Sequence, residues 1–170
     1  MGTRVTQKPL AAVYQVSSGG LRITNSKLLN HTYGYRLSVA EGDYTGVLLI
    51  NDSSIEDMDI AAVSLFSEGT PFGSVSLANN EVTCPKYVEV LGNTPWLSLL
   101  SIQGGPVNIN GAGPAIDLQC GVAGVTVGGI PFLGNGLAKH AIAYPAAYAN
   151  QTAIAGNVYQ GFTGTPVTQY

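Results

Sequence analysis

Apolar and polar residues alternate with a period of two along most of this chain. In one segment Tyr35, Leu37 and Val39 alternate with Arg36 and Ser38. Successive side chains of a β-strand point to opposite faces, so this alternation predicts strands that bury one face. The pattern recurs at 21–24, 63–65, 74–77, 88–90, 107–109 and 116–120. No window of about a dozen residues keeps the 3.6-residue period of a helix, so the chain is predicted to be all-β.

Turn-forming residues separate these strands at short intervals, as at Asn51-Asp52, Gly69-Thr70-Pro71 and Asn79-Asn80. Many short strands with frequent turns are typical of antiparallel sandwiches. We therefore predict an antiparallel β-sandwich or a jelly-roll-like fold over residues 21–136. We identify no internal repeat. Short helices are expected only near Ser54–Met58, where Ser53 and Glu56 have the spacing of a capping box, and near Leu137–Ala143.

Two flanking segments differ from this central domain in composition. Residues 1–20 are predicted to form a polar N-terminal arm that ends in Ser17-Ser18-Gly19-Gly20. Residues 137–170 are predicted to form a C-terminal extension rich in Gly, Ala and Tyr, in which Pro145 and Gly156 prevent one continuous helix. This extension either docks on a neighbouring subunit or completes the chain's own sheet.

Charged residues are scarce in the second half of the chain. From Gly92 to Tyr170, a span of 79 residues, only Asp117 and Lys139 carry a formal charge. About a quarter of the residues of an ordinary soluble domain are charged, and these charges keep a monomer's surface hydrated. The scarcity indicates that other subunits cover this half, in a homo-oligomer such as a trimer. The alternative is an exposed surface that is polar but uncharged.

Aromatic residues in the same half are the candidate contacts for such an assembly, because rigid rings supply contact area at low entropy cost. The tryptophan among them is either a core residue or an interface anchor. The predicted interface residues are Tyr144, Tyr148, Tyr159, Phe162, Tyr170 and Trp96.

The sequence contains no pattern that indicates a catalytic, cofactor-binding or metal-binding site. Neither His31 nor His140 has a Cys, His or carboxylate neighbour at metal-ligand spacing, and no Gly-x-Ser-x-Gly motif is present. Cys84 and Cys120 lie in apolar runs and are expected to be buried free thiols. No enzyme activity is predicted.

Nucleic acid and membranes are not expected as partners either. The net charge is −3, and the few Lys and Arg residues are too scattered to form a basic patch. The longest apolar stretch without charge, residues 121–138, is interrupted by several glycines and by Pro131. It is expected to be a Gly-rich β segment.

The low charge, the abundant Gly and Thr, the short strands and the Ala/Tyr-rich tail together resemble small bacteriophage virion proteins, of the capsid decoration (cement) or minor capsid type. The resemblance is compositional and extends loosely over the whole chain. It implies a structural protein that binds and stabilises a capsid lattice after assembly in the host cytoplasm. Its partners would be its own copies and the major capsid protein or another virion subunit. The alternative function is a carbohydrate-binding adhesin or tail-fibre-type recognition module, whose Tyr residues and Trp96 would stack on sugar rings.

Overall fold

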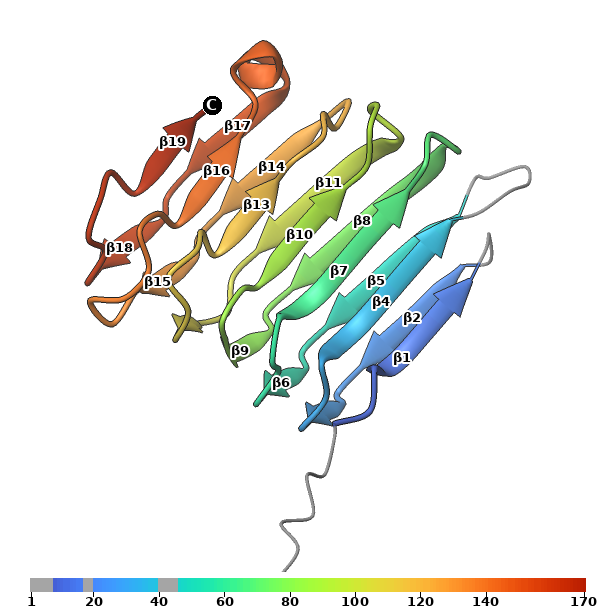
Figure 1. The fold of residues 1–170 in the computed structure, drawn as a ribbon, viewed down its shortest axis with the longest axis horizontal. Helices are drawn as coiled ribbons and strands as arrows, with labels where there is room; N and C mark the ends of the chain where they lie inside the picture. The colour runs from blue at the N-terminus through green and yellow to red at the C-terminus, as the bar shows by residue number, and fades with distance from the viewer. Residues whose placement is uncertain (1–7, 17–19, 40–45) are drawn as a thin grey trace, which may run out of the picture.

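The strands of this protein form a parallel β-solenoid. The computed structural model describes residues 8–16, 20–39 and 46–170, of which 55% are in strands and 4% in helix. The chain is therefore all-β, as predicted. Every pairing between the described strands is parallel, however, and each circuit of the chain adds one strand to each of three sheets (Figure 1). The predicted antiparallel sandwich or jelly roll is wrong, because alternation along a strand does not reveal which strand lies beside it.

The three sheets, here called A, B and C, follow one another around each coil of the solenoid. Sheet A consists of β1 (Ala11–Val16), β4 (Tyr33–Val39), β7 (Ala61–Ser67), β10 (Val88–Leu91), β13 (Ile116–Leu118), β16 (Ile142–Tyr144) and β19 (Val167–Gln169). Sheet B consists of β2 (Leu21–Thr24), β5 (Val47–Asn51), β8 (Phe72–Ala78), β11 (Leu97–Gln103), β14 (Val125–Gly128) and β17 (Thr152–Ala155). Sheet C consists of β3 (Lys27–Leu29), β6 (Ser54–Glu56), β9 (Glu81–Cys84), β12 (Val107–Ile109), β15 (Pro131–Leu133) and β18 (Val158–Gln160).

The coils constitute an internal repeat, contrary to the expectation that the chain has none. In sheet A, Ala11 pairs with Tyr33 and Tyr33 pairs with Ala61. Partners in adjacent coils are thus between 22 and 28 residues apart. Since this spacing is not constant and apolar residues of different types occupy equivalent positions, the repeat is hidden from a comparison of the sequence with itself.

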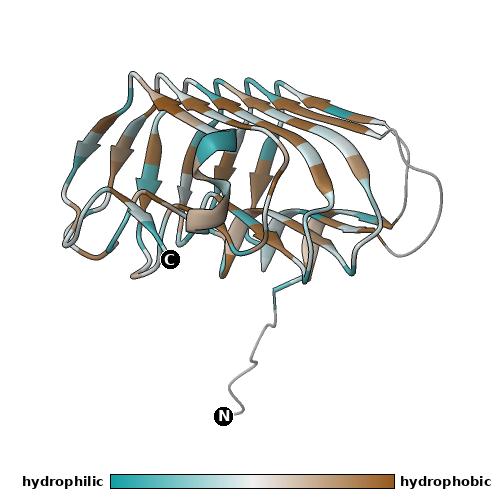
Figure 2. Ribbon diagram, turned by 90° about the horizontal axis from the view of Figure 1, so that it is seen from above, coloured by the Kyte–Doolittle hydropathy of each residue, from teal (hydrophilic) through white to brown (hydrophobic). Residues whose placement is uncertain are grey.

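The core consists of apolar side chains stacked in rows along the solenoid axis. The alternating apolar residues are buried, as predicted. In the ribbon of Figure 2, hydrophobic (brown) segments recur at similar places on neighbouring strands. One row in sheet B contains Ile50, Leu77, Ile102 and Val127, and one row in sheet C contains Ile55, Val82, Val107 and Phe132. Burying each such side chain contributes about 1.5–3 kcal/mol.

The corner between sheets B and C has the same length in every coil. Six residues separate equivalent positions of the two sheets, as from Leu48 to Ser54 and from Val125 to Pro131. At one equivalent position of every corner the residue has a positive φ, between 49° and 68°, which favours Asn, Asp and Gly, and in one corner Gly105 adds a second, at 74°. The residues at the equivalent position are Asn25, Asp52, Asn79, Gly104, Gly129 and Gly156.

Side chains just after this position join successive corners by hydrogen bonds. The Asn80 side chain is fully buried; its Oδ1 accepts from the Ser53 backbone N–H at 3.1 Å, and its Nδ2 donates to the Ile50 carbonyl at 2.7 Å. Asn157 repeats both bonds with Ile130 and Val127. The amides therefore satisfy backbone groups that the turn leaves without ladder partners.

The flanking segments also contribute to the solenoid. Residues 11–16 of the expected N-terminal arm form β1, whereas 1–7 and 17–19 lie outside the described residues. The tail forms the last strand of each sheet, which is the second of the two alternatives that the sequence left open. The two expected helices are wrong, since Ser54–Glu56 is a strand and Ile142 begins another. The helix described is the 3₁₀ helix η1 (Ala146–Gln151), between β16 and β17.

The hydrogen bonds of Asn80 lead to a first prediction. Replacing Asn80 by Ala leaves the buried Ser53 N–H without its acceptor, so the free energy of unfolding should fall by about 2–3 kcal/mol in urea denaturation. The matched control is Asn110→Ala, because Asn110 is exposed and its substitution should cost less than about 0.5 kcal/mol. Equal stability of the two variants would contradict the role given to Asn80.

Candidate functional site

The two ends of the solenoid differ in charge. The N-terminal edge is formed by β1, β2 and β3, which have no partner strand on their outer side among the described residues. It carries the exposed cations Arg22 in β2 and Lys27 in β3. Lys8, just before β1, forms ion pairs of 3.0 Å with both Asp57 and Asp59. Charges of this kind on edge strands prevent the addition of a further strand.

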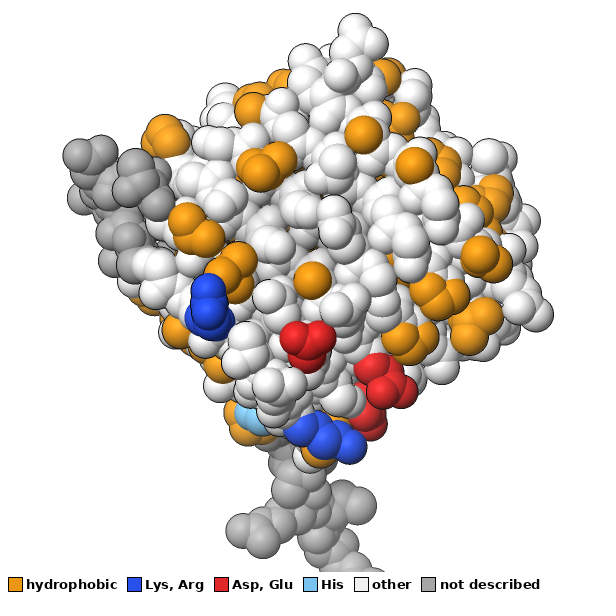
Figure 3. Space-filling model, turned by 180° about the vertical axis from the view of Figure 1, so that it is seen from behind, with side chains coloured by type: hydrophobic (Ala, Val, Ile, Leu, Met, Phe, Trp, Pro, Cys, Tyr) orange, Lys and Arg blue, Asp and Glu red, His pale blue; other side chains and the backbone are white. Residues whose placement is uncertain are grey.

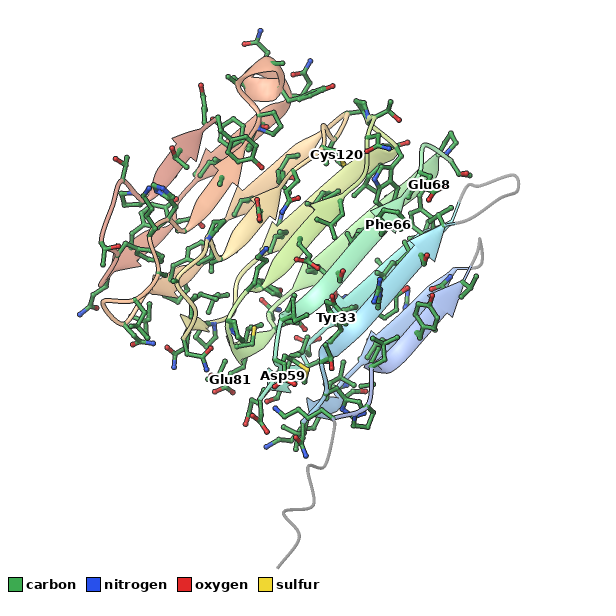
Figure 4. All side chains as sticks on the ribbon, in the orientation of Figure 1. Tyr33, Asp59, Phe66, Glu68, Glu81 and Cys120 are labelled. Atoms are coloured by element: carbon green, nitrogen blue, oxygen red, sulfur yellow. The ribbon has the colours of Figure 1, made fainter. Side chains whose placement is uncertain are left out.

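The C-terminal edge is formed by β17, β18 and β19, which likewise have an unpaired side among the described residues. These strands have four, three and three residues, with the sequences TAIA, VYQ and VTQ, and none of these residues is charged. Figure 3 shows the charged side chains of one face of the molecule gathered toward one end, with none over the rest. Asp59, Glu68 and Glu81 likewise lie beside the coils of β6 to β9, away from β17–β19 (Figure 4).

Equivalent positions at the two edges carry different kinds of side chain. Along sheet B, the row that starts at Arg22 ends at Ala153. Along sheet C, the row that starts at Lys27 ends at Val158, whose side chain is 64% exposed. The same two positions thus carry cations at one end and small or apolar residues at the other. The C-terminal edge lacks the protection that the N-terminal edge has.

The inner rows are also less covered at the C-terminal edge. Ile23 and Leu28, in the first coil, are buried, whereas Ile154 and Tyr159, which end the same rows, are only partly buried. Tyr159 stacks on Phe132 with ring centroids 5.7 Å apart, and Phe162 meets Tyr159 edge to face at 6.5 Å. Burial raises the pKa of Tyr159. A strand added here would cover these half-exposed rings.

A polar cluster on the outer face of sheet A, composed of Ser64, Lys86, Glu89, Asp117 and Gln119, links the coils that precede this edge. Lys86 Nζ lies 3.2 Å from Glu89 Oε2 and 3.0 Å from Asp117 Oδ2, and the two carboxylate side chains are only 6% and 11% exposed. Ser64 donates to Glu89 at 2.8 Å, and Gln119 donates to Asp117 at 3.0 Å. Burial lowers the pKa of Lys86, but Asp117 and then Glu89 outweigh it, so that this pKa is raised.

Tyr170 connects the C-terminal edge to this cluster. Its hydroxyl donates to Asp117 Oδ1 at 3.2 Å and to the Leu118 carbonyl at 2.9 Å, and its backbone N–H donates to the Tyr144 carbonyl. Burial and then the charge of Asp117 raise the pKa of Tyr170. These bonds hold β19, the last strand of sheet A, against the earlier coils.

This cluster is not apparent from the sequence, because Glu89 and Asp117 occupy polar positions of alternating strands, which face away from the core. They do lie on the outer face, but neighbouring side chains bury them. Glu89 and Asp117 are direct partners in β10 and β13. Their proximity can be predicted from the sequence only if the repeat is known.

The predicted interface residues occupy different environments. Trp96 is 3% exposed and donates its indole N–H to the Leu91 carbonyl, so it is a core residue. Tyr144 is buried and accepts a hydrogen bond from Gln169, and the Tyr148 ring lies against Gly121. Tyr159 and Phe162 lie together at the C-terminal edge, and Tyr170, which follows β19, is 58% exposed.

Further features that could form a site are a surface depression and two cysteines. A depression of about 310 Å³ at the corner between sheets B and C is lined by Asp52, Ser53, Ser54, Asn79 and Glu81. No three His, Cys, Asp or Glu side chains among the described residues are grouped so that they could hold a metal ion. Cys84 and Cys120 are buried free thiols, as expected. Among the same residues, no helix has the length and apolar character needed to cross a membrane.

Comparison with known proteins identifies no relative. No protein-family model, no curated protein and no solved structure matches the chain.

The polar cluster yields a prediction about Lys86. Lys86→Met leaves Glu89 and Asp117 side by side without their cation, so the free energy of unfolding should fall by about 3 kcal/mol. Lys139→Met is the matched control, because Lys139 is exposed and no ion pair is described for it. Urea denaturation of both variants at pH 7 tests this, and a Lys86→Met variant as stable as the control would contradict it.

The raised pKa values predict a loss of stability at alkaline pH. Burial raises the pKa of Cys84 from 9.0 to about 12, and the pKa values of Lys86 and Tyr170 are raised as well. A raised pKa means that the folded chain keeps a proton that the unfolded chain releases. The resulting stability is present below the unfolded pKa and is lost as pH rises above it.

The free energy of unfolding should therefore be steady near neutral pH and should decline above about pH 9, where Cys84 begins to ionise in the unfolded chain. Urea denaturation in steps from about pH 7 to about pH 11 measures this. Tyr170→Phe removes one of the titrating groups and should make the decline less steep. Stability that stays constant throughout that range would refute the assignment.

Proposed function

We propose that this chain is a structural subunit of virion type that binds another protein chain through its C-terminal edge. The observation that carries the proposal is the absence of charge from β17, β18 and β19, whose counterparts at the other end include Arg22 and Lys27. Unprotected edge strands accept a partner's strand through backbone hydrogen bonds. The virion setting follows from the compositional resemblance described above.

Two further observations support a protein partner. The half-exposed Ile154, Tyr159 and Val167 offer apolar surface beside the unpaired backbone groups. Tyr170 anchors the last strand to Asp117, so little ordering entropy is lost when a partner binds. By contrast, a sugar-binding role loses its strongest candidate, since Trp96 is buried with its N–H bonded within the chain.

The proposal is tested on particles produced from the genome that encodes the chain. Mass spectrometry of purified particles should detect the chain as a stoichiometric component. Val158→Lys, which places a cation at the position equivalent to Lys27, should reduce the amount of incorporated chain by at least about tenfold.

Leu29→Lys is the matched control, because Leu29 is an exposed residue of β3 in the same sheet but at the opposite end, 40% exposed. Particles should incorporate this variant at the wild-type level. Absence of the wild-type chain from purified particles, or equal incorporation of the two variants, would refute the proposed function.

A further inference from the structure

We propose that the C-terminal edge binds the C-terminal edge of a second copy of this chain, so that two solenoids meet tail to tail about a two-fold axis. This inference rests on the proposed function and identifies the partner at the same surface. Three features of the edge carry it: its three-stranded shape, its lack of charge, and the direction of its strands.

The shape of the edge favours another solenoid end. The unpaired strands belong to three different sheets arranged around one core, so a flat sheet or a single straight strand can pair with only one of them. An end of the same cross-section can approach all three together. In doing so it would also cover Ile154, Tyr159 and Val167, which belong to these three strands and end the inner rows.

The charges of the N-terminal edge favour a contact between two C-terminal edges. A head-to-tail contact would place Arg22 and Lys27 against Ala153 and Val158, at equivalent positions of their rows. Neither Ala153 nor Val158 can pair with a cation, so such a contact gives neither cation a partner across it, and Lys27 has only the 3.5 Å ion pair that it forms with Glu56 of its own chain. A tail-to-tail contact buries no charged side chain of β17, β18 or β19, because they have none.

The direction of the strands is compatible with this arrangement. All described strands run the same way around the axis, so a second copy that faces the first end to end presents strands running the opposite way. The two edges then pair in antiparallel fashion, which is slightly more stable per residue than parallel pairing. A two-fold contact is also closed, whereas a head-to-tail contact would extend into a filament.

The last coil is large enough for a stable contact. It extends from η1 through β19, over residues 146–170, and standard protein interfaces use about 20–30 residues from each partner. The hydrogen bonds of Tyr170 to Asp117 and Leu118 attach the end of this coil to an earlier one.

The experiment transfers the charges of the N-terminal edge to the C-terminal edge of the 170-residue chain. One variant carries Ala153→Lys and Val158→Lys, and its counterpart carries Ala153→Glu and Val158→Glu. Both residues are exposed, so the substitutions leave the core intact, which circular dichroism and the urea midpoint verify. Sedimentation equilibrium measures the dissociation constant of each variant and of their equimolar mixture.

For a tail-to-tail dimer, the wild type should be dimeric, and each variant should dissociate at least about tenfold more readily because like charges face each other. The mixture should recover dimers that contain one copy of each variant. In a head-to-tail contact, the glutamate variant would instead bind more tightly, since its carboxylates would face Arg22 and Lys27. That result, a wild-type trimer, or a wild-type monomer at about 100 µM would overturn the inference.

The two proposals fail in different ways. A chain that is monomeric in solution but enters particles only with an unmodified Val158 would refute the tail-to-tail dimer and leave the proposed function intact. A tail-to-tail dimer that is absent from purified particles would refute the virion role and leave the dimer intact.

Discussion

The structure depends on backbone hydrogen bonds between strands of successive coils, which require each coil to return to the same register. The six-residue step from sheet B to sheet C fixes this register, because the corner repeats one conformation with a left-handed residue at the same place. The other two corners absorb the differences in coil length. Asn80 and Asn157 reinforce the fixed corner by bonding to backbone groups of the preceding coil.

The sequence predicts where the strands are and which residues face inward, but it does not predict which strands pair with one another. Leu37, Val63, Val90 and Ile116 point inward as the alternation predicts, since that pattern reflects the geometry of a single strand. The same alternation suits an antiparallel sandwich and a parallel solenoid. The distinguishing signal is the recurrence of Asn25, Asp52, Asn79, Gly104, Gly129 and Gly156 at spacings of 25 or 27 residues, which looks like ordinary turn chemistry until the repeat is known.

The sequence indicates part of the surface that we propose as the site. The lack of charge in the second half indicates a covered surface, and this uncharged part of the chain includes the edge strands β17, β18 and β19. Tyr159, Phe162 and Tyr170 do lie at or beside that edge, whereas Trp96 and Tyr144 are buried. Burial depends on the neighbouring coil, so no property of these residues alone could have separated the two groups. Similarly, Glu89 and Asp117 became partners only through the pairing of their strands.

The constant corner has a consequence for how such a chain can change its length over evolutionary time. Duplication or loss of a whole coil preserves the cross-section and alters only the length of the rod. Single-residue insertions are tolerable at the corners whose lengths already vary. Between sheets B and C, by contrast, an inserted residue would turn the inward-pointing side chains of the next strand outward and the outward-pointing ones inward. Natural variants of this chain should therefore differ in the number of coils more readily than in the length of that corner.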